Sequence, residues 1–84
     1  VYLLECSDKS YYCGYTKNIE QRLAAHNKGT ASKYTRQRRP VKLVFFEKAK
    51  TQRTAMKREI QIKTFTRKQK KALIENSQKP TRND

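Results

Sequence analysis

The sequence predicts a small α+β domain with a three-stranded sheet and two or three helices. The chain has 84 residues, which allows one domain. Hydrophobic residues make up 35% of it, so we expect a thin core and a site in a surface cleft. Short apolar segments alternate with segments of helical periodicity. We therefore expect one domain over residues 1–76, followed by a polar, flexible tail over residues 77–84.

Apolar, β-prone segments bounded by turn residues predict the strands. They are residues 1–6 (VYLLEC), 11–15 (YYCGY) and 41–47 (VKLVFFE). The turn SDKS between the first two segments predicts a β-hairpin. The third segment is the most apolar, so we expect it at the centre of the sheet.

Alternation along the hairpin predicts which side chains share a face. Tyr2 lies on one face with Leu4 and Cys6, and Tyr12 points the same way as Gly14. A glycine inside a strand is unfavourable unless backbone or a ligand must come close. We therefore expect Gly14 to let a substrate approach the strand.

The first helix is predicted over residues 19–27, after N-cap candidates at 16–18 and before Gly29. Its apolar stripe includes Leu23. Arg22 and His26 are four residues apart, so both project from one face of the helix, beside the core.

Residues 51–65 have a second helical pattern, and a last helix is predicted over residues 67–75. The apolar arc of the second helix is made of Ala55, Met56, Ile60 and Ile62. Glu59 falls inside this arc, where burial of a carboxylate is costly unless something pairs with it. Lys63 is also in the arc, but its long stem can bring its charge to water.

Charge is the strongest signal of function. Lys and Arg number 21 against 7 Asp and Glu, which gives a net charge of +14. Such a balance favours a nucleic-acid partner, with a membrane surface as the second option. We find no apolar run that could span a bilayer and no signal-peptide pattern.

The two cysteines, Cys6 and Cys13, are expected to be reduced thiols packed as small hydrophobes in a cytoplasmic protein, with a disulfide as the alternative. A single histidine with two separated cysteines does not make a zinc site.

Residues 30–40 (TASKYTRQRRP) are predicted to form a basic loop. Its candidate nucleic-acid contacts are Lys33, Tyr34, Arg36, Arg38 and Arg39, with Lys63 added from the second long helix. The cations could instead only solubilise the chain, and Tyr34 could stack on a base or pack inward.

These motifs, in this order, resemble the GIY-YIG nuclease superfamily and its short bacterial single-domain branch. Tyr2 in VYLLEC takes the place of the first signature tyrosine, and YCG at residues 12–14 resembles the second signature. Thr16, Arg22 and His26 follow at the family spacing, and KYTR resembles the signature of the short branch. The resemblance implies an antiparallel three-stranded sheet flanked by helices.

The resemblance also implies roles for the site residues. Glu59 would hold one divalent cation, Mg²⁺ or Mn²⁺, and no small-molecule cofactor is expected. Tyr2 is the candidate general base, Tyr12 would bind water or phosphate, and Arg22 would stabilise phosphate charge. His26 would assist the proton relay or contact phosphate.

Further implications concern the substrate and the end of the domain. DNA is favoured over RNA as the substrate, and the sequence leaves the oligomeric state open. Asn76 is the nearest candidate for a late asparagine that some members have.

Plain structural interpretations stand beside these roles. Tyr2 and Tyr12 could simply pack in the core, and His26 could be structural. Arg22 could be a solvated charge. Glu59 could pair with Lys63 four residues later. A protein that kept the fold without catalysis would be a nucleic-acid-binding module for DNA or RNA.

Overall fold

The computed structural model describes residues 1–78. Strands and helices follow one another in this order: β1 (Tyr2–Glu5), β2 (Tyr11–Gly14), α1 (Ile19–Lys28), α2 (Lys33–Arg36), β3 (Lys42–Phe46), α3 (Gln52–Lys63) and α4 (Arg67–Gln78). The predicted α+β class and three-stranded antiparallel sheet are confirmed.

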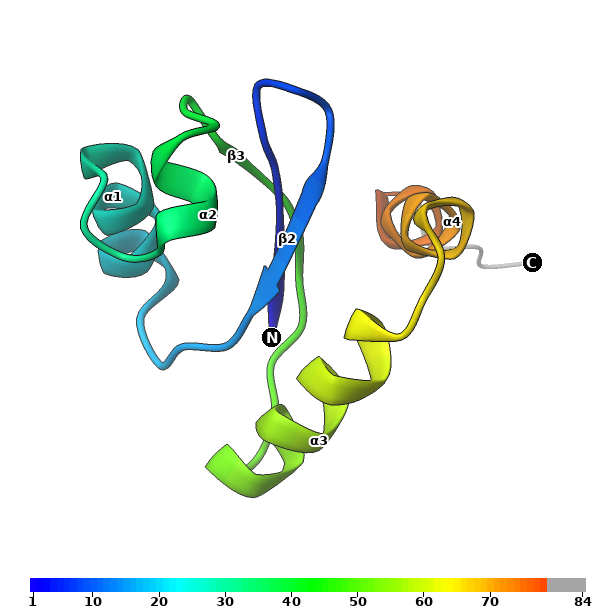
Figure 1. Ribbon diagram of the computed structural model, residues 1–84. Coiled ribbons are helices and arrows are strands. Elements are labelled where there is room, and N and C mark those ends of the chain that lie inside the picture. The colour runs from blue at the N-terminus through cyan, green and yellow to red at the C-terminus, as the bar shows by residue number, and fades with distance from the viewer. Residues whose placement is uncertain (79–84) are drawn as a thin grey trace.

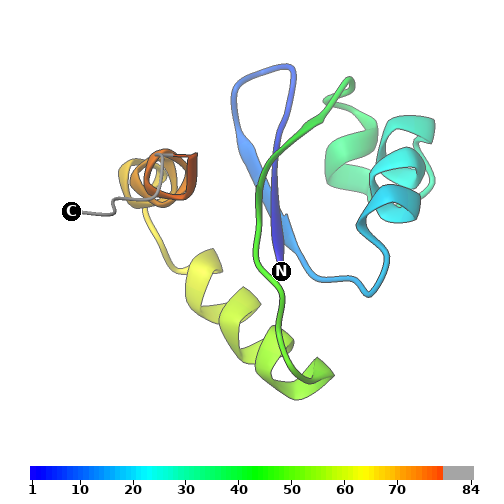
Figure 2. The same cartoon turned by 180° about the vertical axis from the view of Figure 1, so that it is seen from behind.

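Helices cover both faces of the sheet. Figure 1 shows α1 and α2 together on one side of the strands and α4 on the other, with α3 beyond one end of the sheet. The opposite view in Figure 2 shows the same arrangement. Chain segments from the two halves of the sequence therefore meet at the end of the sheet that α3 approaches.

The order of the strands differs from the expected one. β1 lies at the centre and pairs antiparallel with both β2 and β3, so the expectation that residues 41–47 form the central strand is wrong. In β3, Lys42, Leu43 and Phe46 are exposed, whereas Leu3 and Leu4 of β1 are fully buried. The third strand is therefore an edge strand with β1 as its neighbour, and the more deeply buried β1 is the central one.

The two faces of the sheet hold two separate clusters, as strand alternation predicts. Tyr2, Leu4 and Cys6 face α1 and pack with Val41. The other face packs against α3 and α4 through Val1, Leu3, Cys13, Phe45, Ala55, Ile62 and Ile74. Both cysteines are buried and free.

Helix α1 begins and ends as the sequence predicts. The Asn18 side chain accepts a hydrogen bond from the Gln21 amide at 3.1 Å, and Gly29 ends the helix with a φ of 92°. The last turn is fixed to the sheet by Asn27, whose side chain exchanges hydrogen bonds of 2.8 and 3.0 Å with the Val41 backbone. This pairing sets the height of α1 over the strands.

The expected basic loop contains a short helix. Ser32 caps α2 by accepting a hydrogen bond from the Tyr34 amide at 3.1 Å. Thr35 is fully buried, which holds this turn against α1. Cap and burial together order a segment that the sequence presents mainly as cations and turn residues.

Helix α3 is rotated relative to its expected arc. Met56 and Ile60 are 43% and 61% exposed, so their place in the core is wrong. Ala55 and Ile62 are buried, and Glu59 lies between them on the same stripe. The spacing of four and three residues directs these side chains at the sheet. Glu59 is therefore on the inner face of α3, as predicted.

Helix α4 begins after Thr66, whose hydroxyl accepts from the Gln69 amide while the Gln69 side chain accepts from the Thr66 amide. The helix runs on to Gln78, and the rest of the expected tail, residues 79–84, lies outside the described residues. Asn76 is exposed on this helix. Within residues 1–78, no helix is long and apolar enough to cross a bilayer.

Gly14 lies directly opposite Tyr2 in the β1–β2 register. A Cβ atom at Gly14 would come within 2.6 Å of the Tyr2 hydroxyl and 2.7 Å of its Cζ. Glycine is thus required here by the phenol ring of the paired strand. The expected approach of substrate at this position stays a prediction.

We predict that Gly14→Ala lowers the free energy of unfolding by about 1–3 kcal/mol, because the ring of Tyr2 has to move. Urea unfolding measures this loss. In a Tyr2→Leu background the added methyl no longer meets a ring, so the same substitution should cost less. Equal losses in both backgrounds would contradict the close approach.

Candidate active site

A cleft of about 850 Å³ opens at the end of the sheet beside α3. Five of the candidate site residues line it: Tyr2, Tyr12, Gly14, Arg22 and Glu59. They come from β1, β2, α1 and α3, so the fold brings together groups that are up to 57 positions apart (59 − 2).

Behind the cleft, a buried chain of hydrogen bonds connects three side chains. The Tyr2 hydroxyl is bonded to Nε2 of His26 at 2.8 Å. Nδ1 of His26 is bonded to Oγ1 of Thr35 at 2.8 Å. The three residues are at most 2% exposed. Helix spacing predicted only that His26 projects beside the core, and the structure buries it in contact with Tyr2.

Aromatic rings surround this chain. Tyr12 packs edge-on against His26 with ring centroids 5.1 Å apart, and Tyr34 lies 6.0 Å from Tyr12. Tyr34 is 37% exposed, so its ring is neither buried nor fully free. The guanidinium of Arg38 lies over this ring at 3.8 Å. The aromatic row therefore runs from the buried histidine out to the surface of α2.

Burial sets the protonation of the two central groups. Desolvation and the nearby Tyr12 raise the pKa of Tyr2 well above its usual value, although Arg22 acts in the opposite direction. Desolvation and then Arg22 lower the pKa of His26 from 6.5. In this environment Tyr2 is a neutral phenol and His26 a neutral imidazole near pH 7. The lowering effect of Arg22 is therefore smaller than the effect of burial on the pKa of Tyr2.

Glu59 contributes a carboxylate at the cleft wall, with its side chain 17% exposed. Its Oε2 lies 3.6 Å from Nζ of Lys63, so the predicted pairing of these residues is present. The thiol of Cys13 donates to the Glu59 carbonyl at 3.8 Å, and burial raises the pKa of that thiol to about 11. The protonated thiol therefore attaches this turn of α3 to β2.

A second contact holds α3 to the sheet. Arg58 donates from Nε and Nη2 to the two carboxylate oxygens of Glu47, at 3.0 and 3.3 Å. Glu47 follows β3 and itself lines the cleft. Both carboxylates at the cleft are therefore paired, Glu47 with Arg58 through two hydrogen bonds and Glu59 with Lys63 through one contact of 3.6 Å.

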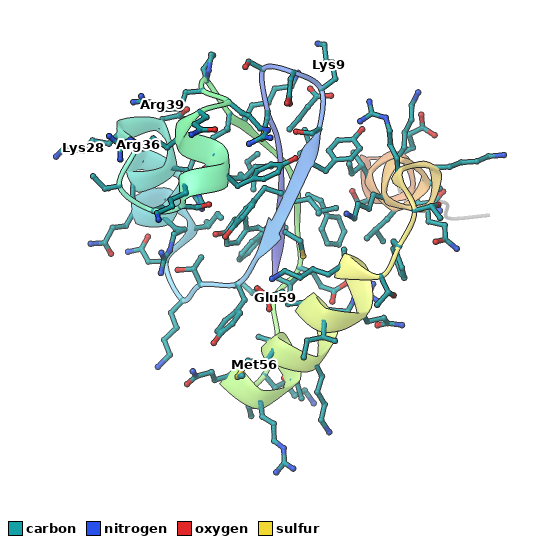
Figure 3. The ribbon with its side chains drawn as sticks, viewed as in Figure 1. Lys9, Lys28, Arg36, Arg39, Met56 and Glu59 are labelled. Atoms are coloured by element: carbon teal, nitrogen blue, oxygen red, sulfur yellow. The ribbon has the colours of Figure 1, made fainter. Side chains whose placement is uncertain are left out.

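The cations of α2 lie apart from the cleft. Figure 3 shows Arg36, Arg39 and Lys28 on the outer surface of α1 and α2, whereas Glu59 lies between α3 and the sheet. Arg39 donates to the Arg36 and Lys28 carbonyls at 2.9 and 3.3 Å. It thereby provides hydrogen bonds to the last carbonyls of α2 and α1.

Two more of the cations predicted to contact nucleic acid differ in their contacts within the protein. Arg38 forms an ion pair with Asp8 at 3.0 Å, and Lys33 is exposed. Nucleic-acid contact by any residue of this set stays a prediction.

Three lysines at the cleft were missed by the sequence interpretation: Lys17, Lys48 and Lys50. All are exposed, and no ion pair among residues 1–78 involves them. Lys17 follows the second signature, and Lys48 and Lys50 precede α3, so only the folded chain brings them together. Thr35 was also missed, because nothing in a basic, turn-rich segment indicates a buried hydroxyl.

The arrangement combines a neutral phenol and a proton-accepting imidazole with an arginine, several lysines and one carboxylate. A phosphodiester in such a cleft meets donors for its oxygens and a route for a proton. Comparison with known proteins also points to phosphodiester chemistry. Residues 1–72 match the GIY-YIG catalytic domain family.

Individual relatives match over nearly the whole chain. A UPF0213 protein of Staphylococcus haemolyticus is 52% identical over 75 residues, covering 89% of this chain and 92% of the relative. One from Haloquadratum walsbyi is 51% identical, covering 89% and 84%. The solution NMR structure of the UPF0213 protein of Bacillus halodurans covers 94% of this chain and 84% of its own, with a TM-score of 0.60 and 37% identity. This chain belongs to the GIY-YIG family of nuclease domains and, within it, to the UPF0213 group.

Proposed function

We propose that the protein is a divalent-metal-dependent endonuclease that hydrolyses phosphodiester bonds in DNA. The observation that supports this most is the hydrogen bond between Tyr2 and His26 at the back of a cleft that Arg22 and Glu59 also line. The two free, buried cysteines agree with action in the reducing cytoplasm.

His26 solves the difficulty of using a buried tyrosine as a base. A phenol with a raised pKa is a poor proton acceptor by itself. If water gives a proton to the Tyr2 oxygen while Tyr2 passes its own proton to Nε2 of His26, the phenol stays neutral throughout. The hydroxide oxygen then bonds to phosphorus, and the bond from phosphorus to the leaving sugar oxygen breaks. The net proton acceptor is His26.

The cleft cations stabilise the negative charge that develops on phosphate. Arg22 has a planar fork of donors that suits two phosphate oxygens. Lys17, Lys48 and Lys50 line the same cleft and would contact phosphates on either side of the one attacked. The cations on α2 would then bind nucleic acid farther from the reaction.

GIY-YIG nucleases generally use a divalent metal, and the residues here fit a hydrated ion. Residues 1–78 contain no cluster of three or more His, Cys, Asp or Glu side chains. Mg²⁺ and Mn²⁺ keep several water ligands and can be bound through one carboxylate, which Glu59 would supply. Such an ion would stabilise charge on the leaving oxygen.

Cleavage assays with a labelled single-stranded and duplex DNA panel in Mg²⁺ or Mn²⁺ test this assignment. We expect Tyr2→Phe, Arg22→Ala and Glu59→Gln each to lower the rate by about 100-fold or more, because each removes charge stabilisation or proton transfer. Tyr11→Phe on the opposite face of the sheet and Glu75→Gln on exposed α4 are matched controls that should cut normally. Undiminished cleavage by Glu59→Gln would contradict the assignment of Glu59 as the metal ligand.

The rate should depend on pH through His26. Only the neutral ring accepts a proton, and burial lowers its pKa from 6.5. The single-turnover rate is therefore expected to be level above pH 6.5 and to fall as the pH drops through the lowered value. A parallel NMR titration of the ring, the only histidine in the chain, should give the same midpoint. A rate that falls at a pH well above that midpoint would contradict this role.

A second function is favoured by one specific observation. The ion pair between Glu59 and Lys63, at 3.6 Å, neutralises the carboxylate without any metal. A nucleic-acid-binding module that retains the fold without catalysis would have this pair as a purely structural contact.

Binding in EDTA separates the two functions. The module should bind DNA or RNA with equal affinity with and without metal, with an affinity that falls steeply with salt. Arg36→Ala should weaken its binding, whereas Tyr2→Phe should not. For the nuclease, Lys63→Met should leave metal-dependent cleavage in place, because Glu59 then has only the ion to pair with. Metal-independent binding without any cleavage would favour the module.

A further inference from the structure

We propose that Thr35 is a positioning residue that holds the imidazole of His26 in its Nδ1–H tautomer, so that Nε2 is free to accept a proton. This inference rests on the proposed function of Tyr2 and His26. It concerns the buried hydroxyl of the KYTR segment, Lys33–Arg36.

The geometry of the three groups leaves little freedom. Both ring nitrogens of His26 are used, one by Tyr2 and one by Thr35, each at 2.8 Å. The histidine is 1% exposed and Thr35 is 0% exposed. Water therefore does not compete for either nitrogen, and the two hydroxyl partners decide which nitrogen has the proton.

The hydroxyl of Thr35 has one proton to give. Its Oγ1 lies 3.4 Å from the Ser32 carbonyl oxygen and donates to it. The same oxygen can then only accept from the ring, so the proton lies on Nδ1. Nε2 is left as the acceptor that faces Tyr2. The other tautomer would make Nε2 a donor and remove the acceptor that the proton transfer requires.

The placement of Thr35 depends on α2. Ser32 provides both the N-cap of this helix and the carbonyl that orients the threonine hydroxyl. The adjacent Tyr34 lies on the outer side, 37% exposed and close to Tyr12. One four-residue helix thus holds the histidine from behind and contributes an aromatic ring to the surface beside the cleft.

A buried threonine can also be present only for packing, and the substitution Thr35→Val separates the two roles. Valine matches the shape of threonine but lacks the hydroxyl, so packing is conserved and the hydrogen bond is lost. Thr35→Ser keeps the hydroxyl and loses a methyl group. Thr35→Ala is a second hydroxyl-free variant in case the valine disturbs the fold.

The ring nitrogens report the tautomer directly. The chain has one histidine, so two-bond ¹H–¹⁵N spectra of the full chain contain a single imidazole. We expect a protonated Nδ1 and an unprotonated Nε2 in the wild type and in Thr35→Ser. In Thr35→Val the proton should shift to Nε2 or divide between the two nitrogens. Thr30→Val, at an exposed site before α2, is the matched control and should leave the spectrum unchanged.

Cleavage provides the second measurement. Thr35→Val should lower the rate by about 10–100-fold, as removal of a group that orients a functional side chain usually does. Thr35→Ser should restore most of it. A Thr35→Val protein with the wild-type tautomer would overturn the proposal, and so would a Thr35→Ser protein that resembles Thr35→Val in both measurements.

The NMR spectra test the role of Thr35 independently of the proposed nuclease activity. They need neither metal nor nucleic acid. If the wild type cuts no DNA while its tautomer depends on the Thr35 hydroxyl, the positioning of His26 holds and the nuclease assignment fails. If the wild type cuts DNA and the tautomer of His26 is unchanged in Thr35→Val, the nuclease assignment holds and the positioning role fails.

Discussion

A buried phenol hydroxyl on the central strand is the constraint on which the rest of the site depends. Tyr2 is 2% exposed, so its hydroxyl needs a partner inside the protein. His26 provides that partner, and Thr35 satisfies the other ring nitrogen. The buried side-chain polar atoms of residues 1–78 all have such partners. The same hydroxyl also restricts position 14 to glycine, because a Cβ there would overlap the ring.

The site is assembled from two halves that are fixed to the sheet by different interactions. Asn27 attaches α1 to β3 through two backbone hydrogen bonds, and this places Arg22 and His26. On the other side, the ion pair of Glu47 with Arg58 attaches α3. Both attachments are partly buried. Ala55 and Ile62 of α3 also pack in the core cluster on that face of the sheet, so the half that holds Glu59 is attached by apolar contacts as well.

The excess of positive charge is divided between structural and accessible cations. Arg38 and Arg39 are hydrogen-bonded within the protein and order the segment around α2. The three cleft lysines are exposed and lie outside the ion pairs of the described residues. A net charge of +14 thus gives a general attraction for a polyanion, while the position of each cation decides whether it can reach a phosphate in the cleft.

Local sequence patterns were sufficient to predict much of the secondary structure and several of the side chains that share a face. Strand alternation predicted that Tyr12 shares a face with Gly14, and helix spacing predicted that Arg22 and His26 project together, because both periods are properties of the backbone. The register that places Tyr2 on the same face as Tyr12 came from the structure. Helix periodicity also placed Glu59 on the inner face of α3. The strand order, the exposure of Met56 and Ile60, and the burial of Thr35 were decided only by the tertiary structure. Each depends on which neighbour covers a face, and this is set by contacts between residues far apart in the chain. The hydrogen bonds of His26 were also decided by the tertiary structure. His26 is 24 positions away from Tyr2 in the sequence, and the fold has to bring the last turn of α1 beside that tyrosine.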